Sequence, residues 1–235
     1  MKNASLIVSL LLNLVLIGSL WYLVQSLGGF SYMLFKMKHR GATGVYELRK
    51  SVFEVMPQDT GSIVLVGNSL TAACEWSELL GLPVKNRGIA GEVTAGLLDR
   101  LPSITALRAS RLFLMIGIND LLFVTPQEVL KNYERILRQI REESPHTEVF
   151  ILSVLPINNG VRETGIRPED ILALNTGIQE LADRHLGTYV NLYRRLVDEE
   201  GNLAARYTYD GIHLTGEAYL IWKSVLEGYL GEGLE

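Results

Sequence analysis

Ile63 to Val66 is an uninterrupted aliphatic run that ends at Gly67 and leads into Asn68 and Ser69. A short run of this kind, rich in Val and Ile, predicts a strand buried on both faces, as in a parallel sheet. Four more short apolar runs follow along the chain, at residues 84–87, 111–116, 148–154 and 188–192. Helical patterns separate these runs, so the chain is predicted to form an α/β fold in which right-handed crossovers join five parallel strands.

Several segments between these runs have the apolar spacing or the end signals of helices. The clearest start is Thr125 to Glu128, because a Thr cap, Pro at the first helical position and Glu at the third fit a capping box. Pro145 stops the helix that begins there. The expected helices cover residues 43–56, 76–80, 93–101, 126–143, 168–185 and 215–229.

The first segment of the chain differs in composition from everything that follows. Ala4 to Val24 contains no charged residue and is dominated by Leu, Ile and Val. A helix of this length rises roughly 30 Å, enough for a bilayer core, which predicts a transmembrane anchor over residues 1–28. A cleavable signal peptide is the alternative, although the apolar run is longer than the ~7–15 residues of a signal core.

The remaining domain boundaries follow from the pattern after this anchor. Residues 29–60 are expected to hold a basic and aromatic juxtamembrane segment and a leading helix, and residues 61–235 a single α/β domain. Lys2 on one side of the apolar run and Lys36 and Lys38 on the other give opposing signals for orientation. The short Met-Lys start resembles an export signal, which favours a main domain outside the cytoplasm.

Composition excludes several classes of protein. With 48% hydrophobic and 20% charged residues, the chain is expected to form a globular core and not a disordered segment. A formal net charge of -4 argues against nucleic acid as a partner. Cys74 is the single cysteine, which excludes an internal disulfide and a multi-cysteine zinc site. Neither a cofactor nor a metal is expected.

Ser69 follows the first predicted strand, at the sheet edge where open α/β proteins bind their ligands. A hydroxyl at that place can act as a nucleophile if a base reaches it. Of the four histidines, His39 lies beside the predicted anchor, and His146 and His185 fall at the opposite end of the sheet. His213 lies between the last strand and the last helix, at the same end as Ser69, and is therefore the candidate base.

Three further residues fall at the same predicted edge. Asp210 precedes His213 by three residues and can orient its imidazole. In the strand order 2-1-3-4-5, Asn119 after the third strand faces Ser69 after the first, and its amide can donate to an oxyanion. Gly91, after the second strand, lets a bare backbone N–H approach the substrate. Each residue alone is also typical of an ordinary turn or cap, but their joint placement favours a catalytic site.

Four blocks of this sequence resemble those of the SGNH, or GDSL-type, esterase family. In order they are Gly67-Asn68-Ser69-Leu70, Asn86-Arg87-Gly88-Ile89-Ala90-Gly91, Gly117-Ile118-Asn119-Asp120 and Asp210-Gly211-Ile212-His213-Leu214. The resemblance covers residues 62 to about 230 and implies a flavodoxin-like, three-layer α/β/α sandwich. It implies Ser69 as nucleophile with Asp210 and His213 as its partners. It also implies an oxyanion hole made of the Ser69 N–H, the Gly91 N–H and the Asn119 side chain.

One position departs from the family pattern, because Asn68 stands where the family usually has Asp. Asn keeps the hydrogen-bonding shape of Asp and removes its charge. The sequence around the blocks is most similar to the branch of platelet-activating-factor acetylhydrolase-like and sugar O-acetyl esterases. The α/β-hydrolase elbow is a poorer match, since a second Gly should then stand at the position of Thr71.

The sequence therefore predicts a metal-independent serine esterase that works through an acyl-enzyme. The family resemblance implies small acyl groups, above all acetyl, on a carbohydrate or lipid substrate. A thioesterase or lysophospholipase of the same family is one alternative, and acyl transfer to a cell-envelope polymer is another. A non-catalytic binding module with the same fold is the third alternative, against which the intact Ser69, Asp210 and His213 argue.

Overall fold

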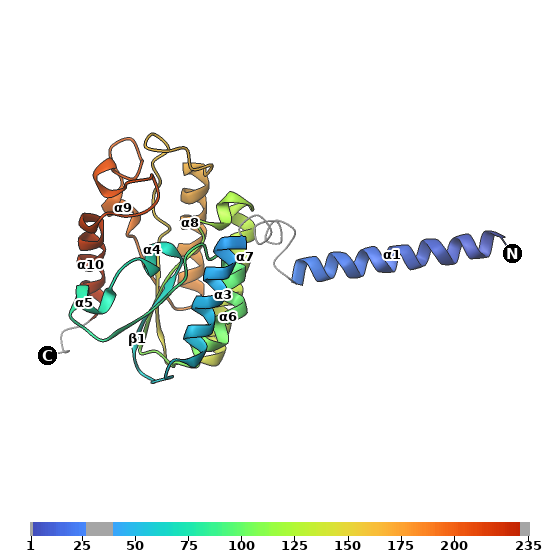
Figure 1. The fold of residues 1–235 in the computed structure, drawn as a ribbon, viewed down its shortest axis with the longest axis horizontal. Helices are drawn as coiled ribbons and strands as arrows, with labels where there is room; N and C mark the ends of the chain where they lie inside the picture. Colours follow the sequence, from blue (N-terminus) through green and yellow to red (C-terminus); the bar gives the residue numbers. More distant parts are fainter. Residues whose placement is uncertain (1, 27–39, 231–235) are drawn as a thin grey trace. The chain divides into compact units, whose positions relative to one another are not determined.

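The structure, a computed structural model, describes residues 2–26 and 40–230, with side chains for residues 9–25 and 44–230 (Figure 1). The chain divides into two compact units, residues 1–40 and 41–235. In the first unit the structure describes one helix, α1 (Lys2–Ser26). The second unit contains the sheet and the helices that cover it, and all predicted site residues belong to it.

The predicted transmembrane anchor is not supported by the structure. Among the residues whose side chains are described, which in α1 are 9–25, there is no helix of the length and apolarity that crossing a membrane requires. The location of the main domain outside the cytoplasm stays a prediction. Residues 27–39, which include most of the predicted juxtamembrane segment, lie outside the described residues.

Five strands form one parallel sheet in the order β2-β1-β3-β4-β5, which confirms the predicted topology. The register pairs Gly67 at the end of β1 with Gly88 of β2 and with Met115 of β3. The carboxyl ends of these three strands therefore finish level at one edge. The strands are β1 (Ile63–Gly67), β2 (Val84–Gly88), β3 (Arg111–Met115), β4 (Glu148–Leu152) and β5 (Thr188–Val190).

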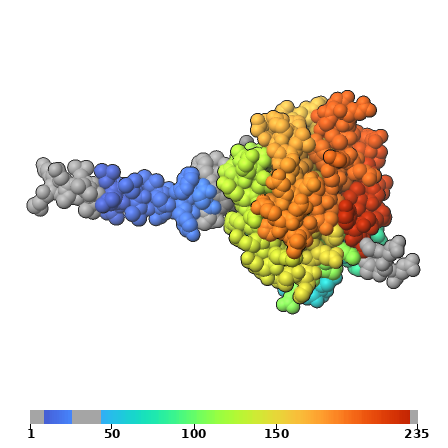
Figure 2. All heavy atoms as spheres, turned by 180° about the vertical axis from the view of Figure 1, so that it is seen from behind, coloured from blue at the N-terminus to red at the C-terminus, as the bar shows by residue number. Residues whose placement is uncertain are grey.

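Helices cover both faces of the sheet and make the three layers that were predicted (Figure 1). Alternate strand side chains point to opposite faces, so Val64 and Leu114 pack on one helical layer and Leu65 and Phe113 on the other. The first layer consists of α6 (Thr94–Thr105), α7 (Pro126–Glu143) and α8 (Pro168–Arg184). The second contains α5 (Trp76–Leu80) and α10 (Gly216–Leu230). Figure 2 shows the yellow-green to orange atoms of α7 and α8 on the outer side of the first layer.

The predicted leading helix is present as α3 (Arg40–Val55) and packs onto the α/β unit. The Tyr46 hydroxyl donates to the backbone oxygen of Gly96 at 2.9 Å. Phe53 is buried, and the guanidinium carbons of Arg87 and Arg100 lie 4.9 and 5.7 Å from the centre of its ring. Cations at this distance are attracted to an aromatic face. These contacts join α3 to β2 and α6.

The sequence pattern missed the short elements and some element ends. It gave no boundaries for α4 (Ser69–Ala72), α9 (Tyr193–Leu196) or the 3-10 helices η1 (Asp120–Leu122) and η2 (Ala205–Tyr207). Strand β4 ends at Leu152, although the apolar run continues to Val154. The reason is a side chain: Asn175 accepts from the Val154 N–H at 2.7 Å and donates to its oxygen at 2.8 Å, so these groups are occupied outside the sheet.

Candidate active site

Ser69 is the first residue of α4, the short helix that follows β1 directly. The side-chain oxygen of Asn68 accepts a hydrogen bond from the Leu70 N–H at 3.0 Å and so caps this helix. Asn and Asp are about equally good in that role, because both offer an acceptor oxygen. The departure from the family pattern at Asn68 therefore preserves the cap that fixes Ser69.

Two glycines permit the close approach of this turn to the sheet. A Cβ at Gly67 would lie 2.4 Å from the backbone oxygen of Met115. A Cβ at Gly88 would lie 2.5 Å from the backbone nitrogen of Ala72. Contacts below 3.0 Å with backbone atoms cannot be relieved by a side-chain rotation. Any larger residue at either position would therefore displace the turn that carries Ser69.

Asn86 supports the far end of α4, a role that the sequence did not indicate. Its Nδ2 donates to the backbone oxygens of Thr71 and Cys74, both at 3.0 Å, and its Oδ1 accepts from the Gly88 N–H at 2.9 Å. Nε1 of Trp76 also donates to the Thr71 oxygen, at 2.8 Å. The available signal for this role was an Asn in the middle of a predicted strand, since strand interiors disfavour Asn.

The structure brings the predicted nucleophile, base and carboxylate together in one row of hydrogen bonds. Ser69 Oγ lies 3.0 Å from Nε2 of His213, and Nδ1 of His213 lies 2.7 Å from Oδ2 of Asp210. Oδ1 of Asp210 accepts from the backbone N–H groups of Ile212 and His213 at 3.0 and 2.8 Å. The Asp210 carboxylate therefore fixes both the ring of His213 and the turn that bears it.

Opposing effects set the ionisation of Asp210. Desolvation by burial raises the pKa of its carboxyl, but the hydrogen bonds from the His213 ring and from the backbone of His213 and Ile212 outweigh it. The charge of His213 also lowers the pKa of the Asp210 carboxyl, and the resulting pKa is about 2. The carboxylate is thus ionised at neutral pH and available to stabilise an imidazolium.

The loop that carries Asp210 and His213 is held by two residues that the sequence analysis did not single out. Thr208 is buried, and its hydroxyl oxygen accepts from the N–H groups of Asp210 and Gly211 at 3.3 and 2.9 Å. The Asn158 N–H donates to the Gly211 oxygen at 2.8 Å. Gly211 has a φ of +85°, and a Cβ there would lie 2.5 Å from the Asn158 oxygen. A threonine two residues before an Asp-Gly pair is a turn signal that could have been used.

Gly91 and Asn119 follow the strands on either side of β1, as predicted. Gly91 has a φ of +76°, a conformation that favours glycine. Nδ2 of Asn119 donates to the backbone oxygen of Glu92 at 2.9 Å. That bond orients the Asn119 amide and leaves its second N–H for another acceptor. The structure therefore joins the turn after β3 to the loop after β2, beside the turn that carries Ser69.

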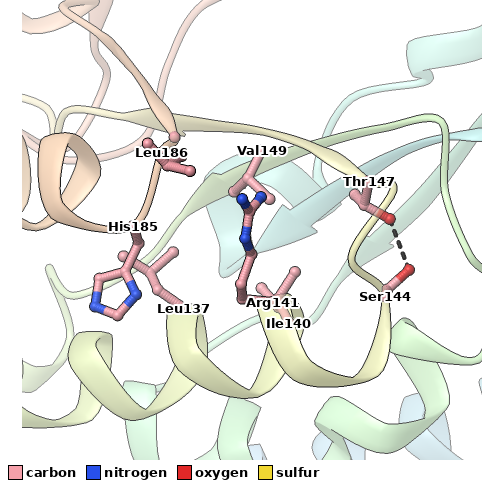
Figure 3. A pocket seen from close by; sticks show the side chains of 9 residues that line it. Leu137, Ile140, Arg141, Ser144, Thr147, Val149, His185 and Leu186 are labelled. Carbon is pink, nitrogen blue, oxygen red and sulfur yellow. Dashed lines mark hydrogen bonds between the residues drawn. The ribbon is translucent and has the colours of Figure 1, made fainter.

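The other histidines lie as the sequence predicted, apart from His39, which is outside the described residues. His146 is exposed in the turn before β4. His185 lines a small pocket at the amino-terminal ends of β4 and β5, and its Nε2 lies 2.8 Å from Oε1 of Glu134. Figure 3 shows His185 at one end of this pocket and the hydrogen-bonded hydroxyls of Ser144 and Thr147 at the other.

Two observations concern metal binding and the reactivity of the cysteine. Within residues 9–25 and 44–230, no group of three or more His, Cys, Asp or Glu side chains could hold a metal ion. Burial, helped by the charge of Glu75, raises the pKa of the Cys74 thiol to about 11. A thiol with that pKa is protonated at neutral pH and unreactive as a nucleophile.

The fold and the row of Ser69, His213 and Asp210 are those of an ester hydrolase. Residues 65–221 match the sequence model of the GDSL-like lipase/acylhydrolase family. The match covers more than half of the chain, and the chain therefore belongs to this GDSL-like lipase/acylhydrolase family.

Solved structures of related fold agree with this assignment. A Streptococcus pneumonia protein named for platelet activating factor is 27% identical, with a TM-score of 0.75 over 85% of this chain and 99% of the other. A GDSL-like lipase from Bacteroides thetaiotaomicron is 24% identical, with a TM-score of 0.68 over 78% and 96%. The acetyl xylan esterase AlAXEase is 16% identical, with a TM-score of 0.61 over 72% and 100%. The likeness to the last two is one of fold.

Curated relatives of similar sequence are longer proteins. The N-acylneuraminate cytidylyltransferase of Escherichia coli is 26% identical over 177 residues, which cover 72% of this chain and 39% of that protein. The enzyme of the same name from Streptococcus agalactiae is 24% identical over 148 residues, 63% of this chain and 34% of the relative. The chain thus spans about two fifths or less of the length of these relatives.

Proposed function

We propose that this hydrolase is a serine esterase that removes small acyl groups, above all acetyl, from carbohydrate or lipid esters through an acyl-enzyme. The observation that carries the proposal is the pair of distances around one imidazole. Nε2 of His213 lies 3.0 Å from Ser69 Oγ, and Nδ1 lies 2.7 Å from Asp210 Oδ2. A nucleophile and a base within hydrogen-bond reach, with the base oriented by a third group, are what acyl transfer needs.

In the first half of the reaction Ser69 Oγ attacks the ester carbonyl carbon while Nε2 of His213 takes the hydroxyl proton. The carbonyl oxygen becomes an oxyanion, for which the Ser69 N–H, the Gly91 N–H and the free N–H of the Asn119 amide are the donors. The tetrahedral intermediate collapses as the ester C–O bond breaks, and His213 passes its proton to the leaving alcohol. Asp210 keeps the imidazole in the required tautomer throughout.

In the second half water takes the place of the alcohol. His213 removes a proton from the water as its oxygen attacks the acyl carbon, and the same donors stabilise the second oxyanion. The bond between the acyl carbon and Ser69 Oγ then breaks, the proton returns to Ser69, and the carboxylic acid leaves. None of these steps uses a metal or an organic cofactor.

The substrate class rests on the family and on the names of similar proteins. One solved relative is named as an acetyl xylan esterase and another as an acetyl-xylooligosaccharide esterase. The curated relatives are named for N-acylneuraminate, an acylated sugar acid. These names support an acylated carbohydrate as the substrate ahead of a long-chain lipid.

A panel of p-nitrophenyl esters from acetyl to palmitoyl, assayed with the full chain, tests both parts of the proposal. Acetyl or propionyl is expected to give the highest kcat/KM, and Ser69→Ala is expected to lower kcat by about 10⁴-fold or more. Ser144→Ala is the matched control, since that serine lies in the pocket of His185 at the other end of the sheet, and its activity should stay within about twofold of wild type.

Three outcomes would count against the proposal. Highest activity on long chains would favour the lysophospholipase or thioesterase alternative. Acetylated product that forms when an acceptor sugar is added would favour acyl transfer. Undiminished activity of Ser69→Ala, together with no labelling of Ser69 by a fluorophosphonate, would contradict the serine mechanism itself.

A further inference from the structure

Asn119 and Asp120 are neighbours in the chain, and both side chains reach the segment that leads into α6. The Asn119 amide donates to the Glu92 oxygen at 2.9 Å. The two carboxylate oxygens of Asp120 lie 3.0 and 3.1 Å from the backbone nitrogen of Thr94 and accept its N–H. One dipeptide after β3 therefore ties down the loop after β2 at two points, both within three residues of Gly91.

The contact between Asp120 and Thr94 is buried and engages every polar atom that Thr94 can offer as a donor. The Thr94 hydroxyl donates to Oδ1 of Asp120 at 2.5 Å, and Asn132 Nδ2 donates to that hydroxyl at 2.9 Å. Thr94 is fully buried, and Asp120 is 5% exposed. Thr94 is also the first residue of α6, so the carboxylate lies at the positive end of a helix dipole.

The same loop is fixed on its other side by a second buried carboxylate. Glu92 accepts from Nε and one terminal nitrogen of Arg100 at 2.6 and 2.5 Å. That terminal nitrogen also donates to the backbone oxygen of Arg87 at 2.7 Å. The Glu92 side chain therefore anchors the loop to α6 and, through Arg100, to β2, whereas Asp120 and the Asn119 amide link it to the turn after β3.

We propose that Asp120 is a positioning residue of the oxyanion hole, which acts through Thr94 to hold the Gly91 loop against the Asn119 turn. The inference rests on the proposed function, in which the Gly91 N–H and the Asn119 amide stabilise one oxyanion. Donors of this kind work because they are already in place when the charge forms. A displacement of about 1 Å can cost roughly 10²-fold in rate, so a group that sets the spacing of two donors affects turnover without touching substrate.

The chemistry of Asp120 supports a role beyond packing. Desolvation by burial raises the pKa of its carboxyl to about 7, in spite of the hydrogen bonds from Thr94, which lower it. Among the described residues no ion pair involves Asp120, so its charge is stabilised by hydrogen bonds and the helix end alone. A buried carboxyl without a cation costs stability, so packing alone does not account for an Asp at this place.

Steady-state kinetics on p-nitrophenyl acetate, with the full chain, tests the inference. Asp120→Ala is expected to lower kcat by about 10- to 100-fold and to change KM by less than about threefold, because the lost interaction acts in the transition state. Thr94→Ser keeps both donors and should retain activity within about twofold, whereas Thr94→Val loses the hydroxyl and should lower kcat by about tenfold. If Asp120→Ala does not fold, Asp120→Asn, which keeps one acceptor oxygen, is assayed in its place.

A double-mutant cycle with Asn119→Ala separates positioning from a general structural effect. Asn119→Ala alone should lower kcat by about 10²–10³-fold. In that background Asp120→Asn should cost at least about threefold less than it does in wild type, because the two residues act on the same donors. Asp198→Asn is the matched control, since Asp198 also accepts two backbone N–H groups, but within its own loop.

The outcomes are decisive in both directions. Fully additive losses in the cycle, or a loss confined to KM, would overturn the role of Asp120 while the dependence on Ser69 remained. Loss of the Ser69 dependence would instead overturn the proposed function. Wild-type kcat in Asp120→Asn together with wild-type kcat in Thr94→Val would also refute the inference.

Discussion

The described part of the chain contains two pairs of a histidine and a carboxylate, one at each end of the sheet. At the carboxyl edge His213 uses Nδ1 to bind Asp210 and presents Nε2 to Ser69 Oγ at 3.0 Å. At the amino edge His185 uses Nε2 to bind Glu134. A histidine beside a carboxylate can serve as the base for a nucleophile only where its second nitrogen lies within hydrogen-bond reach of that nucleophile, as in His213.

The hydroxyls of Ser144 and Thr147 at the amino edge bind each other and the backbone. Ser144 Oγ and Thr147 Oγ1 lie 2.7 Å apart, and Thr147 donates to the Ala109 oxygen at 2.7 Å (Figure 3). At the carboxyl edge, by contrast, the hydroxyl of Ser69 has the imidazole of His213 as its partner. The amino edge therefore holds hydrogen bonds within the fold, whereas the carboxyl edge pairs a hydroxyl with an imidazole.

The direction of the helices adds to the contrast. Helix α6 begins at the carboxyl edge, so its positive dipole end lies there, beside the Asp120 carboxylate that accepts from the Thr94 N–H. Helices α7 and α8 end at the amino edge, where Arg141 and Arg184 stand in their last turns. Negative charge is thus stabilised at one edge and positive charge at the other.

The largest predicted difference between the two edges concerns the histidines. His213→Ala should lower kcat on p-nitrophenyl acetate by about 10⁴-fold or more, because the base and the proton donor are lost together. His185→Ala should leave kcat within about twofold of wild type. Steady-state assays of both variants, with circular dichroism to verify folding, make the measurement. A comparable loss of kcat in both variants would contradict the assignment of catalysis to the carboxyl edge alone.

The two carboxylates provide the next test. Asp210→Asn should lower kcat by about 10³–10⁴-fold, since an amide can hold the imidazole in the wrong tautomer and cannot stabilise its cation. Glu134→Gln changes the corresponding carboxylate at the amino edge and should leave kcat unaltered. Activity of Asp210→Asn within tenfold of wild type would show that the carboxylate is not needed to orient His213.

The smallest expected effect concerns stability and pH at the carboxyl edge. Burial raises the pKa of Asp120 from its usual 3.8 to about 7. Between these values the folded protein keeps a proton that the unfolded chain has lost, so the contribution of Asp120 to the free energy of unfolding falls as the pH rises from about 4 to 7. Asp120→Asn removes this dependence.

Thermal unfolding at several pH values measures that contribution. Between pH 5 and pH 8 the Tm of Asp120→Asn should rise relative to that of wild type by at least about 2 °C. Glu134→Gln, at the amino edge, is the control. A parallel trend in that control, or a Tm difference for Asp120→Asn that does not change with pH, would rule out burial of Asp120 as the cause.

Much of the fold and of the candidate site could be predicted from local patterns. The run Ile63–Val66 gave the central strand, and the Asp210–His213 turn gave the acid and the imidazole, since spacing within a short segment fixes both. Asp120 was not predicted as a site residue, although it stands beside Asn119. Its partner Thr94 lies 26 residues earlier, and no local pattern reveals such a contact.

The supporting residues escaped prediction for the same reason. Asn86 and Thr208 matter because of backbone groups that only the folded chain brings to them. The predicted end of β4 was too late, because the Asn175 side chain occupies the backbone of Val154 from another helix. The predicted membrane anchor depended on the length and composition of the apolar run and found no support.

The sequence by itself determined the alternation of buried strands and helices, and thus which loops gather at the carboxyl edge of the sheet. It also indicated the candidate site residues, because Ser69, His213 and Asp210 each stand in a recognisable local setting. Only the tertiary structure decided which nitrogen of His213 and of His185 binds a carboxylate, and which side chains hold the loop after β2. Those outcomes depend on distances between residues far apart in the chain, which are fixed when the layers pack.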